Sequence, residues 1–140
     1  MYIDTSVLVP YYCPEALSHA AERTLREDPR PAVSDLVEVE FFSALARKVR
    51  VREMPAADAA RAGEQFLDHL RTGLYARIAV QRRHYDAARG WLARLTLSLR
   101  TLDALHVALA DTEGIRLATA DADLSRSARS LGVAVTLVRA

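Results

Sequence analysis

The stretch MYIDTSVLV, residues 1–9, places a single carboxylate between two apolar segments. A short apolar run ends at Asp4, and apolar residues resume at Val7. A buried charge without a partner is costly, so some group has to compensate Asp4, and a metal ion is one candidate. The acids that would share such an ion with Asp4 have to come from later in the chain.

Length and composition indicate one globular domain, residues 1–140, and a hydrophobic content of 51% excludes disorder. No apolar run reaches the length of a membrane span. The single cysteine, Cys13, excludes an internal disulfide and a cysteine-based metal cage. The N-terminus lacks a basic segment followed by a long apolar stretch, so we expect no secretory signal and a cytoplasmic location. A net charge of +1 does not by itself indicate nucleic-acid binding.

Short apolar runs alternate with segments of helical spacing along the chain. We expect strands at residues 2–4, 32–33, 76–80, 115–119 and 133–138. We expect a short helical turn after residue 4 and helices at residues 15–27, 35–50, 55–71, 83–97, 101–112 and 121–130. The connections between strands are long enough for crossovers. This alternation is typical of an α/β fold, a mostly parallel sheet with helices on both faces.

The sequence predicts the N-terminal cap of one of these helices and the buried face of another. Asp35 is expected to cap the helix 35–50, and Glu38 three residues later completes a capping-box-like pair. The helix 83–97 is expected to bury an apolar face made of Tyr85, Ala88, Trp91, Leu92 and Leu95.

Two acids follow predicted strands at what should be one edge of the sheet. Asp4 ends the first strand, and Asp121 directly follows the strand 115–119. In open parallel sheets, ligands bind beyond the carboxyl ends of the strands, so both acids are candidates for a site there. Asp121 also has a purely structural alternative as a helix N-cap. Its neighbour Asp123 has one as a first-turn acid that the helix dipole favours.

Two helices contribute further candidates. Asp103 lies in the first turn of the helix 101–112, which is apolar nearly all round and should therefore be central. The helix dipole explains a first-turn acid, but an acid on so buried a helix is also a functional candidate. In the helix 35–50, the capping-box pattern gives Glu38 a structural role and leaves Glu40 without one. We therefore predict that Glu40 belongs to the site.

Several carboxylates gathered at one place repel one another, and a divalent cation removes that cost. Ligands that are all oxygen favour Mg²⁺ or Mn²⁺ over zinc. Mg²⁺ keeps several waters and completes its coordination with substrate phosphate oxygens. The chemistry typical of such a site is phosphodiester hydrolysis by metal-activated water.

Four segments together resemble the PIN-domain ribonucleases, and among them the VapC toxins of bacterial toxin–antitoxin pairs. They are YIDTSVLV at residues 2–9, EFFSAL at 40–45, LDALH at 102–106 and TADADL at 119–124. The resemblance covers essentially the whole chain, with the segments in the family's order and spacing. It implies an α/β/α sandwich around a five-stranded parallel sheet, and Mg²⁺- or Mn²⁺-dependent cleavage of RNA.

The resemblance also assigns residues and partners. The metal-binding acids that it implies are Asp4, Glu40, Asp103 and Asp121. Asp123 matches an additional acid that only part of the family carries. Ser6 matches a hydroxyl near the metal, and Thr119 matches the threonine that positions the loop before the last acid. A homodimer and a cognate antitoxin, whose tail covers the acidic site, are further implications.

Other function classes fit the sequence less well. A phosphoacceptor signalling domain needs an acidic pair near the first strand and a lysine at a late strand, but the only lysine is Lys48. A haloacid-dehalogenase-type phosphatase needs a second aspartate two residues after the first, where Ser6 stands. A catalytically silent PIN scaffold that binds RNA or a protein partner stays an alternative, although all four acids are present.

The histidines add one more candidate. His106 lies three residues after Asp103 on the same helical face, which makes a general-base role imaginable. We favour a structural position beside the core, because a metal can generate the nucleophile itself. The remaining histidines, His19, His69 and His84, share no spacing and are expected at the surface.

Overall fold

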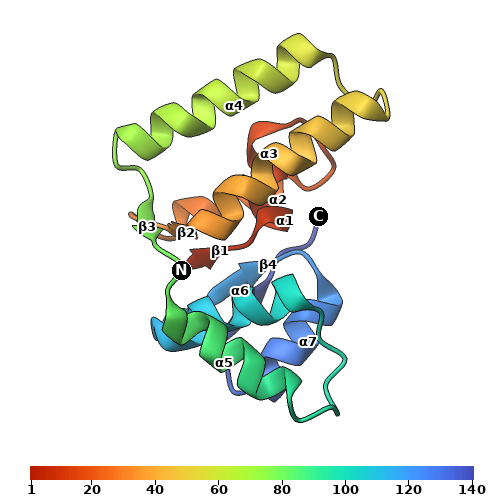
Figure 1. Cartoon of the computed structure of the whole chain (residues 1–140). Helices are drawn as coiled ribbons and strands as arrows, with labels where there is room; N and C mark the ends of the chain where they lie inside the picture. Colours follow the sequence, from red (N-terminus) through yellow and green to blue (C-terminus); the bar gives the residue numbers. More distant parts are fainter.

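The computed structural model of residues 1–140 contains a five-stranded sheet with the strand order β3-β2-β1-β4-β5 (Figure 1). Every pair of neighbouring strands is parallel. The strands are β1 Tyr2–Ile3, β2 Ala32–Ser34, β3 Ala76–Ile78, β4 Leu117–Thr119 and β5 Val135–Leu137. The three central strands, β1, β2 and β4, are buried at every position. Strands covered on both faces have this continuous burial, so the sheet lies between two helical layers.

Seven helices form these layers. They are α1 Thr5–Tyr12, α2 Ser18–Arg26, α3 Asp35–Arg50, α4 Ala56–Arg71, α5 Arg82–Leu92, α6 Thr101–Thr112 and α7 Ala122–Ser130. Figure 1 shows α1 to α4 on one side of the sheet and α5 to α7 on the other. None of the helices combines the length and hydropathy of a membrane span. The predicted α/β/α sandwich with a five-stranded parallel sheet is confirmed.

The order of the strands places a topological switch point between β1 and β4. The chain leaves β1 toward β2 and β3, and then crosses back to β4 and β5 on the other side of β1. Open α/β sheets bind ligands where the strand order reverses in this way, beyond the carboxyl ends of the strands. Asp4 follows β1 and Asp121 lies two residues after the end of β4, whose Ala118 pairs in register with Ile3. Both acids therefore lie at one edge of the sheet, as predicted, and they flank the switch point.

The predicted capping box at the start of α3 is wrong. Ser34 is the N-cap, and its Oγ accepts the third N–H of the helix at 3.2 Å. The carboxylate of Asp35 accepts the backbone N–H of Val80 at 3.0 Å instead. Glu38 does have a structural role, but its partner is Arg77 of β3, whose guanidinium donates to both carboxylate oxygens at 2.8 and 3.0 Å.

Two helix boundaries also differ from the prediction. The first long helix starts at Ser18 rather than Glu15, because the N–H of Glu15 binds Ser18 Oγ at 2.8 Å in a preceding turn. α5 ends at Leu92 rather than Leu97, and Leu95 has a left-handed backbone with a φ of 61°. Leu95 is 91% exposed and Tyr85 is 50% exposed, so neither belongs to the buried face.

A histidine takes part in that buried face of α5. The side chain of His84 is fully buried, which contradicts its predicted surface position. Its Nδ1 accepts the N–H of Gln81 at 2.9 Å, so Nε2 carries the hydrogen and donates to Glu113 Oε1 at 3.0 Å. Glu113 follows the last turn of α6 and also pairs with Arg83. These bonds tie the start of α5 to the end of α6.

We expect this cluster to make the stability of the fold depend on pH. The hydrogen bond from Arg83, followed by that from His84, holds the pKa of Glu113 below its usual value. A depressed carboxyl pKa stabilises the fold above the unfolded pKa, and that contribution is lost as the pH falls through the folded pKa. Glu113→Gln should therefore cost about 1 kcal/mol at pH 7 and progressively less in acid.

Thermal unfolding of the two proteins between pH 7 and pH 3 measures the effect. The melting temperatures of the parent and of Glu113→Gln should converge as the pH falls. Glu27→Gln, at an exposed glutamate that follows α2, is the matched control and should stay parallel to the parent. A difference in melting temperature between the parent and Glu113→Gln that stays constant across this pH range would contradict the stabilising role of ionised Glu113.

Candidate metal centre

Asp4 lies at the carboxyl end of the central strand and is 5% exposed. One of its carboxylate oxygens, Oδ2, accepts the hydroxyls of Ser6 at 2.6 Å and Thr119 at 2.7 Å. The other oxygen, Oδ1, accepts no hydrogen bond, and its ion-pair partner is His106, with Nε2 at 3.6 Å. Asp4 thus has one oxygen fixed by two hydrogen bonds and one that accepts none, and we call the second kind a free oxygen.

The two hydroxyls that anchor Asp4 also hold the loop after β4. Thr119 Oγ1 accepts the backbone N–H of Asp121 at 3.0 Å, and Ser6 Oγ accepts that of Ala120 at 2.9 Å. Each hydroxyl therefore donates to Asp4 and accepts from the loop. This arrangement fixes the position of Asp121 relative to Asp4 through hydrogen bonds on both sides.

Asp121 is the N-cap of α7, as its structural alternative predicts. Its Oδ1 accepts the backbone N–H groups of Asp123 at 2.8 Å and Leu124 at 3.1 Å. Its Oδ2 accepts no hydrogen bond. Capping and metal binding are compatible here, because they use different oxygens of the same carboxylate.

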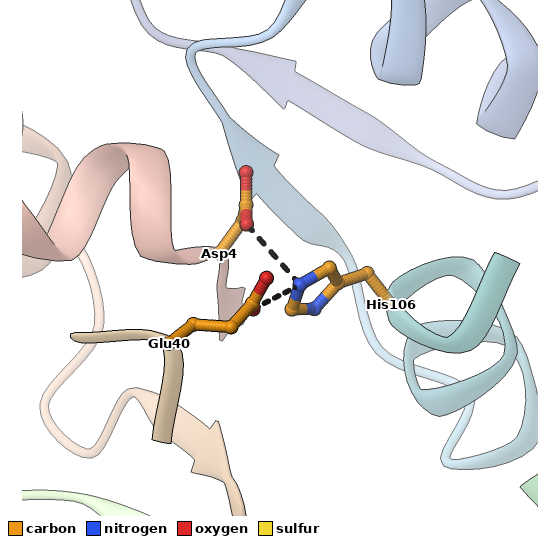
Figure 2. Close-up of side chains that lie close together, drawn as sticks. All are labelled: Asp4, Glu40 and His106. Carbon is orange, nitrogen blue, oxygen red and sulfur yellow. Dashed lines mark hydrogen bonds and ion pairs between the residues drawn. The ribbon is translucent and has the colours of Figure 1, made fainter. Parts of the chain in front are cut away.

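Glu40 approaches Asp4 from α3, and Figure 2 shows both carboxylates and His106 converging from three elements. Glu40 Oε1 accepts Thr5 Oγ1 at 2.9 Å and His106 Nε2 at 2.6 Å, whereas Oε2 accepts no hydrogen bond. Burial raises the pKa of Glu40, but the hydrogen bond and charge of His106 and the hydrogen bond from Thr5 outweigh it and lower the pKa. Glu40 is therefore a carboxylate at neutral pH.

Asp103 lies in the first turn of α6, and its Oδ2 is 3.4 Å from Arg100 Nε. Burial raises the pKa of Asp103; Arg100 opposes this rise, and the negative charge of Asp121 adds to it. The two carboxylates are therefore close enough to repel each other. A cation between them would relieve that repulsion.

Asp123 stands apart from the other acids. Its side chain is 78% exposed and pairs with Arg126 one turn later in α7. Its backbone N–H donates to Asp121 Oδ1, and the residue lines the same cleft as Asp103. The structure thus brings Asp4 and Glu40 into one cluster, places Asp103 near enough to Asp121 for their charges to interact, and leaves Asp123 at the rim.

His106 belongs to the cluster, although its sequence position indicated only a place beside the core. The side chain is 2% exposed, and its ring nitrogens bind Tyr2 and Glu40. Burial lowers the pKa of His106, but the hydrogen bond to Glu40 and the charges of Asp4 and Glu40 raise it overall. The ligand atoms of Asp4, Glu40 and His106 lie within 4.8 Å of one another. The spacing of three residues from Asp103 was the one sequence signal that pointed to this position.

Two clefts adjoin Asp103 and leave room for a substrate beside the acids. One has a volume of about 640 Å³ and includes Glu40 and Asp103 in its lining. The other, of about 540 Å³, lies between Asp103 and the start of α7. Arg100, whose side chain is 85% exposed, lines both clefts.

The four acids share one arrangement. In each, one oxygen is held by hydrogen bonds or an ion pair from the protein, and the second oxygen accepts no hydrogen bond. Free carboxylate oxygens at one sheet edge are suitable ligands for a hard divalent cation such as Mg²⁺ or Mn²⁺. The residues present therefore fit a divalent metal centre.

Comparison with known proteins identifies the family. The model of the PIN domain family matches residues 1–130. Ribonuclease VapC46 of Mycobacterium tuberculosis is 34% identical over 138 residues, which cover 96% of this chain and 95% of the relative.

Two solved structures share the fold. VapC20 of Mycobacterium tuberculosis, a sarcin–ricin loop cleaving toxin, has a TM-score of 0.70 at 21% identity and covers 89% of this chain and 92% of its own. VapBC2 of Rickettsia felis, bound to a fragment of its promoter DNA, has a TM-score of 0.71 at 15% identity and covers 99% and 98%. The chain therefore belongs to the PIN-domain family and, within it, to the VapC ribonucleases.

Proposed function

We propose that this chain is the toxin of a toxin–antitoxin pair and hydrolyses RNA phosphodiester bonds with Mg²⁺ or Mn²⁺. The proposed metal-binding and catalytic acids are Asp4, Glu40, Asp103 and Asp121. The observation that carries the proposal is their shared arrangement, with one anchored and one free oxygen each, at the switch point of the sheet. A catalytically silent scaffold would have no reason to keep four carboxylates oriented in this way.

The cation, when bound, would lower the pKa of water and would stabilise phosphate oxygens as a Lewis acid. The protein residues orient the carboxylates, and the hydroxyls of Ser6 and Thr119 keep Asp4 fixed. Arg100 lies at the junction of the two clefts, where its guanidinium suits contact with a phosphate of the RNA backbone. Its pairing with Asp103 keeps this charge beside the acids.

The partners follow from the same proposal. VapBC-5 of Mycobacterium tuberculosis, another protein of similar fold, is a member of the VapBC family of toxin–antitoxin systems, and we extend to this chain a cognate antitoxin and a homodimeric state. Expression of the chain alone should arrest growth, and expression with its antitoxin should not. Asp123 is left out of the proposed ligand set, because its carboxylate is exposed and paired with Arg126.

The purified protein, free of antitoxin, should cleave structured RNA with Mg²⁺ or Mn²⁺ and stop when EDTA is added. Asp4→Asn keeps an oxygen for Ser6 and Thr119 and places an amide where the free oxygen stood. Loss of groups that only support metal ligands costs about 10- to 100-fold, so we expect Asp4→Asn to lose about 100-fold or more. It should also relieve growth arrest. Equal cleavage or toxicity of Asp4→Asn and the parent would show that the site is misassigned.

A comparison of two glutamates on α3 tests the choice of Glu40. Glu40→Gln should abolish metal-dependent cleavage, because its amide replaces the free oxygen. Glu38→Gln should change the rate by no more than about twofold, since Glu38 pairs at the surface with Arg77. Initial cleavage rates of both variants on one RNA decide the matter. A larger loss in Glu38→Gln than in Glu40→Gln would reverse the assignment.

Metal binding should also stabilise the fold. At a Mn²⁺ concentration 100 times the dissociation constant, a single site adds about 2.7 kcal/mol to the stability of the native state. Asp121→Asn should lose much of this gain, yet it should keep the stability of the metal-free protein, because asparagine caps helices as well as aspartate does. Thermal unfolding with Mn²⁺ and with EDTA measures both. An undiminished Mn²⁺ effect in Asp121→Asn would exclude it from the ligand set.

A further inference from the structure

A line of buried hydrogen bonds leads from the core to Glu40. His106 Nε2 lies 2.6 Å from Glu40 Oε1, and His106 Nδ1 lies 2.7 Å from the hydroxyl of Tyr2. The same hydroxyl lies 2.8 Å from Ser34 Oγ. Ser34, Tyr2 and His106 are each at most 2% exposed. Only the last member of the line, Glu40, reaches solvent.

Each member of this line is close in sequence to one of the proposed metal-binding acids or to the helix that carries it. Tyr2 lies in β1, and Asp4 follows the strand two residues later. Side chains two residues apart on a strand point to the same face. Ser34 caps α3, the helix of Glu40, and His106 lies on α6 with Asp103. Because α3 and α6 belong to opposite helical layers, the bond between His106 and Glu40 joins the two layers at the sheet edge (Figures 1 and 2).

The direction of the bond to Glu40 is fixed by chemistry. An ionised carboxylate can only accept, so Nε2 carries the shared hydrogen in either protonation state of the imidazole. The lone pair that a metal would need on this nitrogen is therefore absent while the bond to Glu40 is intact. Glu40 Oε1 receives two donors, from His106 and Thr5, and Oε2 alone is left to bind a cation.

We propose that His106 is a positioning residue that presents the free oxygen of Glu40 to the metal, and that Tyr2 holds the imidazole in the required orientation. This inference rests on the proposed metal-dependent function and adds a role for two residues outside the ligand set. Partners that orient metal-binding side chains from behind typically change metal affinity by about 10- to 100-fold when they are lost.

Two substitutions of His106 separate its hydrogen bonds. The amide nitrogen of asparagine is as many bonds from Cα as Nδ1, and that of glutamine is as many as Nε2. His106→Asn should therefore lose the bond to Glu40 and weaken Mn²⁺ binding about tenfold or more. His106→Gln should keep a donor for Glu40. Its Mn²⁺ affinity should therefore be closer to that of the parent than the affinity of His106→Asn is. Calorimetric titration of the full chain with Mn²⁺, after removal of metal with EDTA, gives both affinities.

A matched control is available in the second buried histidine. His84 also donates Nε2 to a glutamate, but it lies in the contact between α5 and α6. His84→Asn should lower the melting temperature and leave the Mn²⁺ affinity unchanged. Tyr2→Phe removes only a hydroxyl that touches no acid, and it should weaken Mn²⁺ binding about threefold through the loss of one hydrogen bond to the imidazole. This variant tests the line if His106→Asn fails to fold.

A spectroscopic measurement on the parent distinguishes positioning from ligation. Electron spin echo modulation of bound Mn²⁺ should show no coupling to a directly coordinated imidazole nitrogen. Such a coupling would overturn the inference, as would equal affinities of His106→Asn and the parent, or of His106→Asn and His106→Gln. A parent that binds no Mn²⁺ at all would instead refute the proposed function on which the inference rests.

Discussion

The charge of Asp4, buried at the end of the central strand, is the constraint on which the rest of the site depends. A carboxylate in that position is stable only if the protein supplies hydrogen bonds. Ser6, two residues later, and Thr119, from the neighbouring strand, supply them to one oxygen. The same hydroxyls accept the N–H groups of the loop that carries Asp121, so the groups that stabilise Asp4 also place its partner.

The topology of the sheet brings the other acids to the same edge. Because β1 lies between β2 and β4, the helices that follow β2 and precede β4 both pass the carboxyl end of β1. These helices, α3 and α6, carry Glu40 and Asp103 from opposite layers of the sandwich (Figure 1). Four acids far apart in the chain therefore meet through one reversal of the strand order.

Much of this arrangement could be predicted from the sequence, because it depends on local patterns. The alternation of apolar runs and helical segments predicts the parallel sheet, and the rule of strand ends places Asp4 and Asp121 at one edge. The structural role of Glu38 was expected for a different reason from the one observed. Local spacing indicated a capping box, whereas its actual partner, Arg77, is 39 residues away in β3. Local patterns do not contain such tertiary pairings.

The boundaries of α5 and the positions of the histidines show the same limit. The apolar residues after Leu92 continue a helical spacing, but Leu95 has a left-handed backbone and points its side chain into solvent. A single histidine gives no periodic signal, so the burial of His84 could not be predicted, whereas the apolar helix around His106 indicated its place beside the core. Each pairs through Nε2 with a glutamate that is far away in the sequence, and local spacing does not contain such a pairing.

The contrast between these two histidine–glutamate pairs explains why one is structural and the other belongs to the site. Glu113 accepts from His84 and also from Arg83, so its charge is already balanced within the protein. Glu40 accepts from His106 and from the neutral hydroxyl of Thr5, beside the further carboxylate of Asp4. The first pair is electrostatically complete and holds two helices together. The pair of His106 and Glu40 leaves an excess of negative charge at this edge of the sheet, where carboxylate oxygens accept no hydrogen bond. A divalent cation supplies the positive charge that would balance it.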